Sequence, residues 1–379
     1  MTMQAPTAPA PIEGDIGTIY VSLELSQRSW LAVIHSPDQG RLSRHKLEAG
    51  DCAGLLALLA KVRSRVARWS GSHPSVVSCY EAGYDGFWLH RRLAAEGIEN
   101  VVIDPASLSV DRRARRVKTD RLDGEQMIRA LLAWRRGEPR VMSVVRVPSA
   151  DQEDARRRTR ERERLVKEQT GHLNRIKALL RTVGLAADKL GRADWATTWL
   201  AQQRDWQGQP LRALLVAELT REHARLMLVR EQLETLAEQP MPQPISTTAH
   251  QLMQLKGLGP VISATLTSEL LWKDFKNRRE VASYTGLTPS AWRSGGVEHD
   301  QGISKAGNKR ARYVAVELAW LWLKNQPQSA LSRWFHDRVG EQRGRIRRIA
   351  IVALARKLVV ALWRFVTTGL LPTDAVLKA

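Results

Sequence analysis

The sequence contains very little cysteine. Only Cys52 and Cys79 occur among its 379 residues, too few for a disulfide framework, and they form no CxxC pair of the kind that structural zinc sites use. We therefore expect a protein of a reducing compartment that is stabilised neither by disulfides nor by structural zinc.

Long uninterrupted apolar stretches are also absent. The longest, residues 349–365, contains Arg356, Lys357 and Arg364, and such charges cannot lie unpaired in a hydrocarbon layer about 30 Å thick. The N-terminal stretch MTMQAPTAPAPIEGD has neither the basic residues nor the apolar core of a signal peptide, and its Ala/Pro repeats predict a disordered leader over residues 1–16. The sequence thus predicts a cytoplasmic protein without a membrane segment.

Acidic residues are scarce relative to basic ones. The chain has 59 Lys and Arg but 39 Asp and Glu, a net charge of +20, which indicates a polyanionic partner, with nucleic acid favoured over an anionic membrane surface. Hydrophobic residues make up 43% of the chain, which excludes a disordered protein. A chain of this length is typical of two or three domains.

Residues 17–148 are predicted to form a mixed α/β domain. A strand, a tight turn and a second strand are expected over 18–34, where β-branched and aromatic residues alternate. A helix over 51–69, with Asp51 as its N-cap, then leads into a strand, helix, strand and helix. The expected segments are 75–82, 87–97, 98–105 and 120–136. This order of elements is typical of an α/β fold.

Residues 149–240 have a different composition, with interleaved opposite charges and Leu, Ile and Val at intervals of three and four. This pattern predicts two long helices that form a coiled-coil spacer; a spacer that only sets distance or dimerises is the alternative. Pro240, Pro242 and Pro244 then indicate a linker. Residues 245–379 are predicted to form a mostly helical domain, in which the LAWLWL run packs Trp320 and Trp322 into the core rather than against nucleic-acid bases.

Four carboxylates are candidates for a metal site. Glu24 lies on the first predicted strand, Glu81 ends the SVVSCYE strand, and Asp120 and Asp123 begin a helix with both side chains on one face. A DxxD pair at a helix start is by itself more often a cap that complements the helix dipole. Strand and helix acids in this order are, however, the layout of RNase H-like metal nucleases, and carboxylate oxygens suit Mg²⁺ or Mn²⁺.

Basic residues precede the helical acid pair. Such a run is either a solvated surface or a set of phosphate contacts beside a metal site. We favour phosphate contacts, and the candidates are Arg112, Arg113, Arg115, Arg116 and Lys118.

The C-terminal region contains three further candidate motifs. LMQLKGLGPVISATL has the form of a helix-hairpin-helix in which Gly257 and Gly259 approach a phosphate, or else simply join two packed helices. In the loop-like run YTGLTPSAWRSGG, a serine beside an arginine can act as a nucleophile on a phosphate, although most Ser-Gly pairs are merely turns. The ISKAGNKRAR segment begins a helix and supplies more cations. The residues are Ser294, Arg293, Lys305, Lys309 and Arg310.

Taken together and in this order, five segments resemble a known family: CYEAGYDGFW, KTDRLDGEQM, LKGLGPVISA, YTGLTPSAWRSGG and GISKAGNKRAR. The chain resembles the DEDD/serine transposases of the insertion-sequence one-hundred-and-ten type, also called bridge-RNA-guided recombinases. The resemblance spans nearly the whole chain. It implies a RuvC-like (RNase H-like) N-terminal domain, a coiled-coil spacer and a C-terminal transposase domain with a nucleophilic serine.

The family's functional positions fall on Glu24, Glu81, Asp120, Asp123 and Ser294. The family's first acid is usually Asp, so Glu24, one methylene longer, is a departure that changes the geometry of the expected metal site.

The resemblance implies a DNA recombinase of a mobile element, acting as a dimer or tetramer in which the acids of one subunit face the serine of another. It also implies a noncoding bridge RNA that pairs with DNA. The alternatives are a metal-dependent junction nuclease without a covalent intermediate and a catalytically decayed nucleic-acid-binding protein.

Overall fold

The computed structural model describes residues 17–108, 120–240, 245–294 and 297–378, with the backbone alone described for residues 120–122, 245 and 291–301. The chain divides into two compact units, residues 1–147 and residues 148–379. The predicted leader and the basic residues 112–118 lie outside the described residues.

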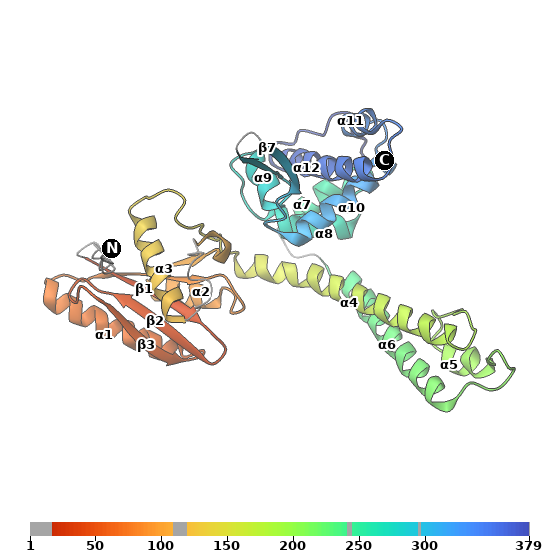
Figure 1. Cartoon of the computed structure of the whole chain (residues 1–379), viewed down its shortest axis with the longest axis horizontal. Coiled ribbons are helices and arrows are strands. Elements are labelled where there is room, and N and C mark those ends of the chain that lie inside the picture. Colours follow the sequence, from red (N-terminus) through yellow and green to blue (C-terminus); the bar gives the residue numbers. More distant parts are fainter. Residues whose placement is uncertain (1–16, 109–119, 241–244, 295–296, 379) are drawn as a thin grey trace, which may run out of the picture. The chain divides into compact units, whose positions relative to one another are not determined.

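The first unit is a five-stranded sheet with helices on its faces (Figure 1). Its strands lie in the order β3-β2-β1-β4-β5; β1, β2 and β3 are antiparallel neighbours, whereas β1, β4 and β5 are parallel. The mixed α/β prediction is therefore confirmed. The elements are β1 (Thr18–Leu25), β2 (Ser29–His35), β3 (Leu42–Glu48), α1 (Cys52–Ser70), β4 (Ser75–Glu81), α2 (Trp88–Ala95), β5 (Glu99–Ile103), η1 (Pro105–Ser107) and α3 (Asp120–Arg135).

Strand β3 was absent from the sequence-based prediction. Its sequence, LSRHKLE, is mostly polar, and every one of its residues is exposed or half-buried because β3 lies at the edge of the sheet. An edge strand without a buried face gives no strong period-two apolar signal. Helix α1 was predicted correctly, because the Asp51 carboxylate does accept a hydrogen bond from the Gly54 amide at 2.7 Å.

Alternate residues of the central strands form two separate cores. Ile19, Val21 and Leu23 of β1 pack with α1 and α2 on one face of the sheet, whereas Tyr20 packs with Met127 and other residues of α3 on the opposite face. This alternation follows from the two-residue repeat of a strand. Because the alternation continues to the end of β1, the position of each later residue in the strand determines which face of the sheet its side chain lies on.

The second unit begins with the α4–α6 helical hairpin. Its two long helices pack along apolar residues that include Leu165, Ile176 and Val229, and the connection places Trp195 in the core, stacked on His223 at 4.9 Å between ring centroids. The prediction of two long helices is confirmed, and their coiled-coil character stays a prediction. The elements are α4 (Ala150–Arg181), α5 (Trp195–Thr198), η2 (Leu200–Gln202) and α6 (Ala213–Glu238).

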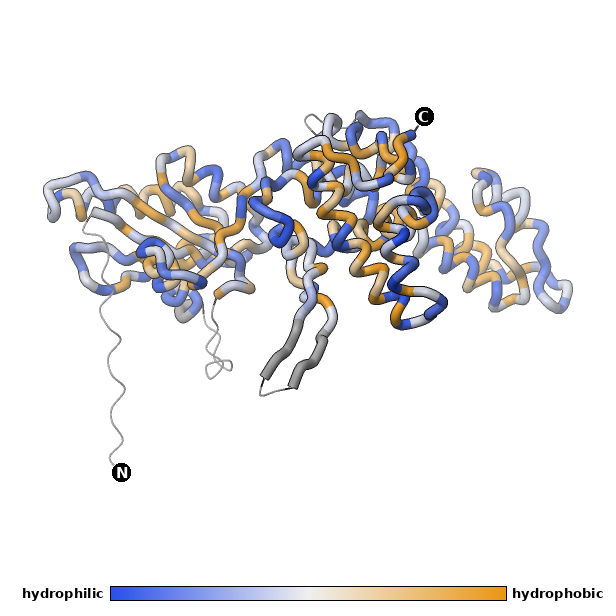
Figure 2. Tube along the Cα trace, turned by 90° about the horizontal axis from the view of Figure 1, so that it is seen from above, coloured by the Kyte–Doolittle hydropathy of each residue, from blue (hydrophilic) through white to orange (hydrophobic). Residues whose placement is uncertain are grey.

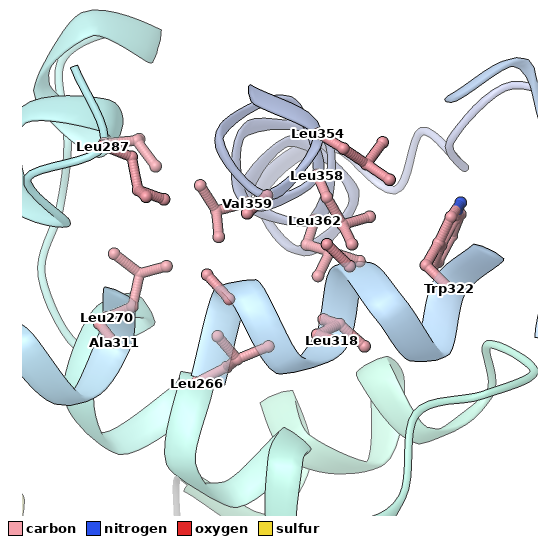
Figure 3. Packing of buried hydrophobic residues seen from close by; sticks show 14 of the residues in the cluster. Leu266, Leu270, Leu287, Ala311, Leu318, Trp322, Leu354, Leu358, Val359 and Leu362 are labelled. Carbon is pink, nitrogen blue, oxygen red and sulfur yellow. The ribbon is translucent and has the colours of Figure 1, made fainter. Parts of the chain in front are cut away.

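The rest of the second unit is mostly helical, as predicted, and surrounds helix α12. Figure 3 shows Leu354, Leu358 and Leu362 of α12 beside Leu318 and Trp322 of α10, and Figure 2 shows hydrophobic and hydrophilic residues alternating along the helices of the chain. Trp322 is fully buried. The elements are α7 (Ile245–Met253), α8 (Pro260–Leu266), the π-helical turn η3 (Thr267–Leu271), α9 (Arg278–Tyr284), α10 (Lys309–Asn325), α11 (Ala330–Val339) and α12 (Arg345–Thr368).

A β-hairpin interrupts these helices where the sequence suggested a loop. Strand β6 (Pro289–Ser294) pairs with the antiparallel strand β7 (Val297–Ile303), with a register shift between Pro289 and Ala291. The Pro, Ser and Gly content of this segment is typical of turns, and it hid the strand pairing. Among the described residues, no helix is long and apolar enough to cross a bilayer.

Gly124 provides a test of how closely α3 packs on the sheet. A Cβ atom at this position would lie 2.7 Å from Cγ2 of Val33. We expect Gly124→Ala to destabilise the first unit, since overpacking costs about 1–3 kcal/mol and outweighs a gain in helix propensity of about 1 kcal/mol. The measurement is urea unfolding of the full chain, followed by hydrogen exchange in peptides of β1 and α3.

Gly171 of α4 is the matched control, because an added Cβ would meet nothing within 4 Å. Gly171→Ala should stabilise α4 by roughly 0.5–1 kcal/mol. Equal stability changes in the two variants would contradict the close packing of α3 on Val33 of β2.

Candidate active site

Glu24 and Glu81 lie at the carboxyl ends of two adjacent parallel strands. In the β1–β4 ladder Leu23 pairs with Tyr80, so Glu24 and Glu81 occupy the next positions of the two strands. Both side chains are half-buried. Neighbouring carboxylates at strand ends can share a cation that neither holds alone.

Helix α3 lies on the same side of the sheet as these two acids. The Ser22 hydroxyl, two residues before Glu24, donates a hydrogen bond to the Gly124 carbonyl at 2.7 Å, and Sγ of Cys79, two residues before Glu81, contacts the Met127 carbonyl at 4.0 Å. Because side chains two apart on a strand share a face, Glu24 and Glu81 face the side that α3 covers.

The start of α3 brings the other two predicted acids to this side of the sheet. Asp123 directly precedes Gly124, which rests on Ser22, and its side chain is half-buried. Asp120 is the first residue of α3, and its side chain lies outside the described residues. Three described carboxylates and the backbone of the fourth thus belong to one side of the sheet.

These acids supply only carboxylate oxygens, which suit hard divalent cations. Within the described part of the chain, no three Asp, Glu, His or Cys side chains are already grouped closely enough to hold a metal ion. That search does not include the Asp120 side chain. The four-carboxylate metal site therefore stays a prediction.

Cys79 lies below the Glu81 carboxylate on the same face of β4. Burial, and then the negative charge of Glu81, raise the pKa of the Cys79 thiol far above its usual range. Cys79 is fully buried, so it remains a neutral thiol. It is a core residue, not a nucleophile.

The candidate nucleophile, Ser294, lies in a strand and not in a loop. It is the last residue of β6, and its backbone pairs with Val297 of β7. Its side chain, and that of Arg293, lie outside the described residues. A serine near the end of a two-stranded hairpin is carried away from the helical core on a defined backbone.

Two glycines that the sequence analysis passed over fix the base of this hairpin. Gly286 and Gly307 have φ values of +66° and +96°. An added Cβ would lie 2.0 Å from the Ala306 oxygen in the first case and 2.3 Å from the Tyr284 oxygen in the second. Only glycine allows the segments before and after the hairpin to approach so closely.

Side chains also fasten the hairpin base. Nη1 of Arg312 donates hydrogen bonds to the carbonyls of Thr285 and Lys305 at 3.1 and 2.9 Å. The backbone N–H of Asn308 donates a hydrogen bond to the Tyr284 carbonyl at 2.7 Å. Oδ1 of Asn308 accepts hydrogen bonds from the backbone amides of Arg310 and Ala311 and so caps α10. The hairpin therefore emerges from a rigid base.

Glu269 joins this base to helix α4. Its carboxylate is 1% exposed and accepts hydrogen bonds from Nε of Arg160 at 2.7 Å and from Nδ2 of Asn308 at 2.9 Å. Arg156 reaches the same turn, where its Nε donates to the Ser268 carbonyl at 3.1 Å and its guanidinium lies 4.1 Å from the centre of the Trp272 ring.

The charge state of Glu269 follows from these contacts. Burial raises the pKa of Glu269, but the hydrogen bonds from Arg160 and Asn308, together with the charges of Arg160 and Arg156, outweigh burial and hold its pKa below the usual range. The carboxylate is therefore ionised at neutral pH. Glu269 was missed from the sequence, although a lone acid within the apolar run TLTSELLW is a signal for a buried, paired charge.

The predicted phosphate-binding cations of this region differ in their surroundings. Lys305 and Lys309 are exposed. Nε of Arg310, in contrast, donates a hydrogen bond to Oε2 of Glu163 on α4 at 2.7 Å, so this guanidinium also has a structural contact. The nucleic-acid-binding role of these residues stays a prediction.

Gly257 and Gly259 connect α7 to α8. Gly257 has a φ of +96° and an added Cβ would lie 2.7 Å from Cβ of Asn325, which gives it a packing role, while Gly259 precedes Pro260 at the start of α8. The helix-hairpin-helix interpretation and the phosphate contact stay predictions.

Comparison with known proteins adds a family context. A family model described as "Transposase IS116/IS110/IS902 family" matches residues 249–333, and a model for DEDD transposases of the IS110 type matches residues 25–184. A Sinorhizobium fredii protein, y4rJ, whose name describes it as a transposase, is 45% identical over 99% of this chain and 98% of its own length.

Two more distant relatives are named after insertion elements. The transposase for insertion sequence element IS1328 of Yersinia enterocolitica is 27% identical over 60% of this chain and 67% of its own length. The transposase for insertion sequence element IS1111A of Coxiella burnetii is 25% identical, over 60% and 62% respectively.

Glu269→Gln tests the buried junction. We expect a loss of about 2 kcal/mol or more, because the charged hydrogen bond to Arg160 is lost and the positive charges around it remain. Since the folded pKa of Glu269 is lowered from 4.5, its contribution is present above that pH and is lost on further acidification. Wild type should therefore lose more stability than the variant as the pH falls below 4.5. Chemical unfolding across this pH range measures both effects.

Glu218→Gln is the control for this variant. Glu218 pairs with Arg175 at the surface, where the two side chains are 36% and 54% exposed, and such pairs contribute about 0–1 kcal/mol. If Glu269→Gln were no less stable than Glu218→Gln, the buried Glu269 contacts would not contribute the expected free energy of unfolding.

Proposed function

Because the chain belongs to the IS116/IS110/IS902 family of transposases, we propose that it cuts and rejoins DNA with Ser294 as the nucleophile and a metal-holding acidic site. The acids are Glu24, Glu81, Asp120 and Asp123. The observation that carries the proposal is the placement of Glu24 and Glu81 at adjacent strand ends, on the side of the sheet that α3 covers.

The acidic site suits a divalent cation in its donor chemistry. Glu24, Glu81, Asp120 and Asp123 would hold Mg²⁺ or Mn²⁺, which supplies charge stabilisation to phosphate oxygens in phosphoryl transfer. The hydrogen bond from Ser22 to the Gly124 carbonyl would hold the backbone of the neighbouring Asp123 beside β1. The longer side chain of Glu24 extends the reach of its carboxylate from β1 by one methylene.

Ser294 would attack a DNA phosphate through its hydroxyl oxygen. A bond forms between Oγ and phosphorus, the bond from phosphorus to one strand oxygen breaks, and that strand leaves with a hydroxyl end. A second DNA hydroxyl then reverses the step and frees the serine. The close approach of the chain at Gly286 and Gly307 and the hydrogen bond of Asn308 support this role, because they define where the strand that bears the nucleophile begins.

The partners follow from the same proposal. The substrate is DNA, and a noncoding bridge RNA would select the sites by base pairing while the basic protein contacts backbones. A dimer or tetramer, with the acids of one subunit facing the serine of another, would restrict cutting to the assembled complex. The α4–α6 hairpin, as a coiled-coil spacer, and the α7–α8 helix-hairpin-helix would support that assembly.

Ser294→Ala tests the nucleophile. We expect it to abolish both strand exchange and the covalent protein–DNA adduct, while DNA binding is kept, because only the attacking oxygen is removed. Denaturing gel electrophoresis of labelled DNA detects the adduct. Ser290→Ala, in the same strand, is the control and should keep both activities. An adduct formed by Ser294→Ala would refute the assignment.

Glu81→Gln tests the acidic site. Loss of a ligand carboxylate should lower the recombination rate by more than about 100-fold, beyond the 10–100-fold typical of outer-shell groups, and should shift the dependence on Mg²⁺ concentration. Glu99→Gln is the control, since Glu99 begins β5 and pairs with Arg135 in an exposed ion pair. Unchanged metal dependence in Glu81→Gln would rule out this role.

A further inference from the structure

A groove between α9 and α12 is not used by the proposed chemistry. Its volume is about 770 Å³, and the C-terminal segment at Leu370–Thr373 completes its wall. A second hollow of about 440 Å³ shares Arg278, Arg364 and Leu370 with the first and continues along α12. We call the two together the α9–α12 groove.

The α9–α12 groove is strongly basic. Its lining includes five cations and no acid, and the cations are Arg278, Arg279, Arg356, Lys357 and Arg364. In the described part of the chain, none of the four arginine side chains has an ion pair or hydrogen bond. Lys357 lies 4.6 Å from the centre of the Trp334 ring, a contact that leaves its charge uncompensated.

Four of the five groove cations are exposed, so a bound anion can reach them. The cations of α12 and the adjacent pair on α9 repel one another, and no carboxylate between them reduces the repulsion. Elsewhere in the same unit arginines do have acidic partners, as in the Arg160–Glu269 and Arg310–Glu163 pairs. The groove therefore has the charge of a site for a polyanion.

The floor of the groove is apolar and favours one kind of polyanion. Val360 and Ala361 of α12, Leu331 of α11 and the exposed Leu370 and Leu371 line it. Trp363 is half-buried at the second hollow. Cations beside an apolar and aromatic surface are the features that bind single-stranded nucleic acids, since bases stack while phosphates meet arginine.

We propose that the α9–α12 groove binds one strand of nucleic acid, with phosphates on Arg278, Arg356 and Arg364 and a base on Trp363. The groove has room for a nucleotide or two within its walls, and the unstacked bases of a single strand can reach its apolar floor, whereas the paired bases of a duplex cannot. The inference rests on the proposed function in that it takes nucleic acid as the substrate class. DNA and RNA share the phosphate chemistry, and the experiment distinguishes them.

The test is binding of labelled oligonucleotides to the full-length chain, measured by fluorescence anisotropy over a series of salt concentrations. The probes are single-stranded DNA, single-stranded RNA of the same sequence, and duplex DNA. All proteins carry Ser294→Ala, and denaturing gel electrophoresis of each probe after the titration checks that it is still intact. Anisotropy then reports binding alone, so the result does not depend on which residue is the nucleophile. Failure of the groove and failure of the catalytic assignment are then separate outcomes.

The groove variant replaces Arg278, Arg356 and Arg364 by Gln. We expect single-strand binding to weaken at least about tenfold at physiological salt, and the slope of log K against log salt to fall by about 0.7 for each phosphate contact removed. If the groove variant loses more affinity for one of the two single-stranded probes, that probe shows whether the groove binds DNA or RNA. The corresponding Arg→Lys variant should keep most of the affinity, because it keeps the charges.

The control replaces Lys177, Arg181 and Arg221 by Gln, which removes the same charge from exposed positions of α4 and α6. Equal weakening in both variants would show a general effect of net charge and would overturn the proposal. Unchanged single-strand binding in the groove variant would also overturn it, as would binding of poly-glutamate in preference to the oligonucleotides by the protein with an intact groove. Thermal unfolding of each variant confirms that the fold is intact.

Discussion

The buried carboxylate of Glu269 is the interaction on which the second unit depends. A charge with 1% exposure persists only when it is paired, and its partners come from segments distant in sequence: Arg160 on α4 and Asn308 before α10. Buried ion pairs add little stability compared with apolar residues of similar size. We infer that this one defines a single arrangement of α4 against the hairpin base, because Asn308 also closes that base through Tyr284.

A corresponding constraint in the first unit is the direction of strands β1 and β4. Since the two strands are parallel and adjacent, their carboxyl ends lie together, and the even-numbered residues of β1 and the odd-numbered residues of β4 face α3. Glu24 and Glu81 are consequently placed on one side by register alone. Cys79, one step earlier on the same face, is buried, so the acids lie where the core ends.

The sequence predicted those parts of the structure that depend on local pattern. Alternation identified β1 and β2, and the Asp51 cap identified α1, because both signals lie within a few residues. The pairing of β6 with β7 was missed since its Pro, Ser and Gly content favours turns. The candidate acids could be chosen by residue type and order, whereas the Glu269 junction and the α9–α12 groove join residues far apart in sequence, which only tertiary structure reveals.

The acidic residues of the proposed metal site and the unpaired basic residues have different tasks, since the first serve the reaction and the second bind the substrate. Glu24, Glu81 and the acids of α3 repel a DNA phosphate unless a cation lies between them, so these carboxylates do not themselves attract the substrate. The net charge of +20 must then supply the attraction. Arginines tied to acids, such as Arg160, contribute less to it than unpaired ones, such as Arg356 and Arg364. Substitutions of the unpaired arginines should therefore change substrate affinity, whereas substitutions of the acids should change metal dependence.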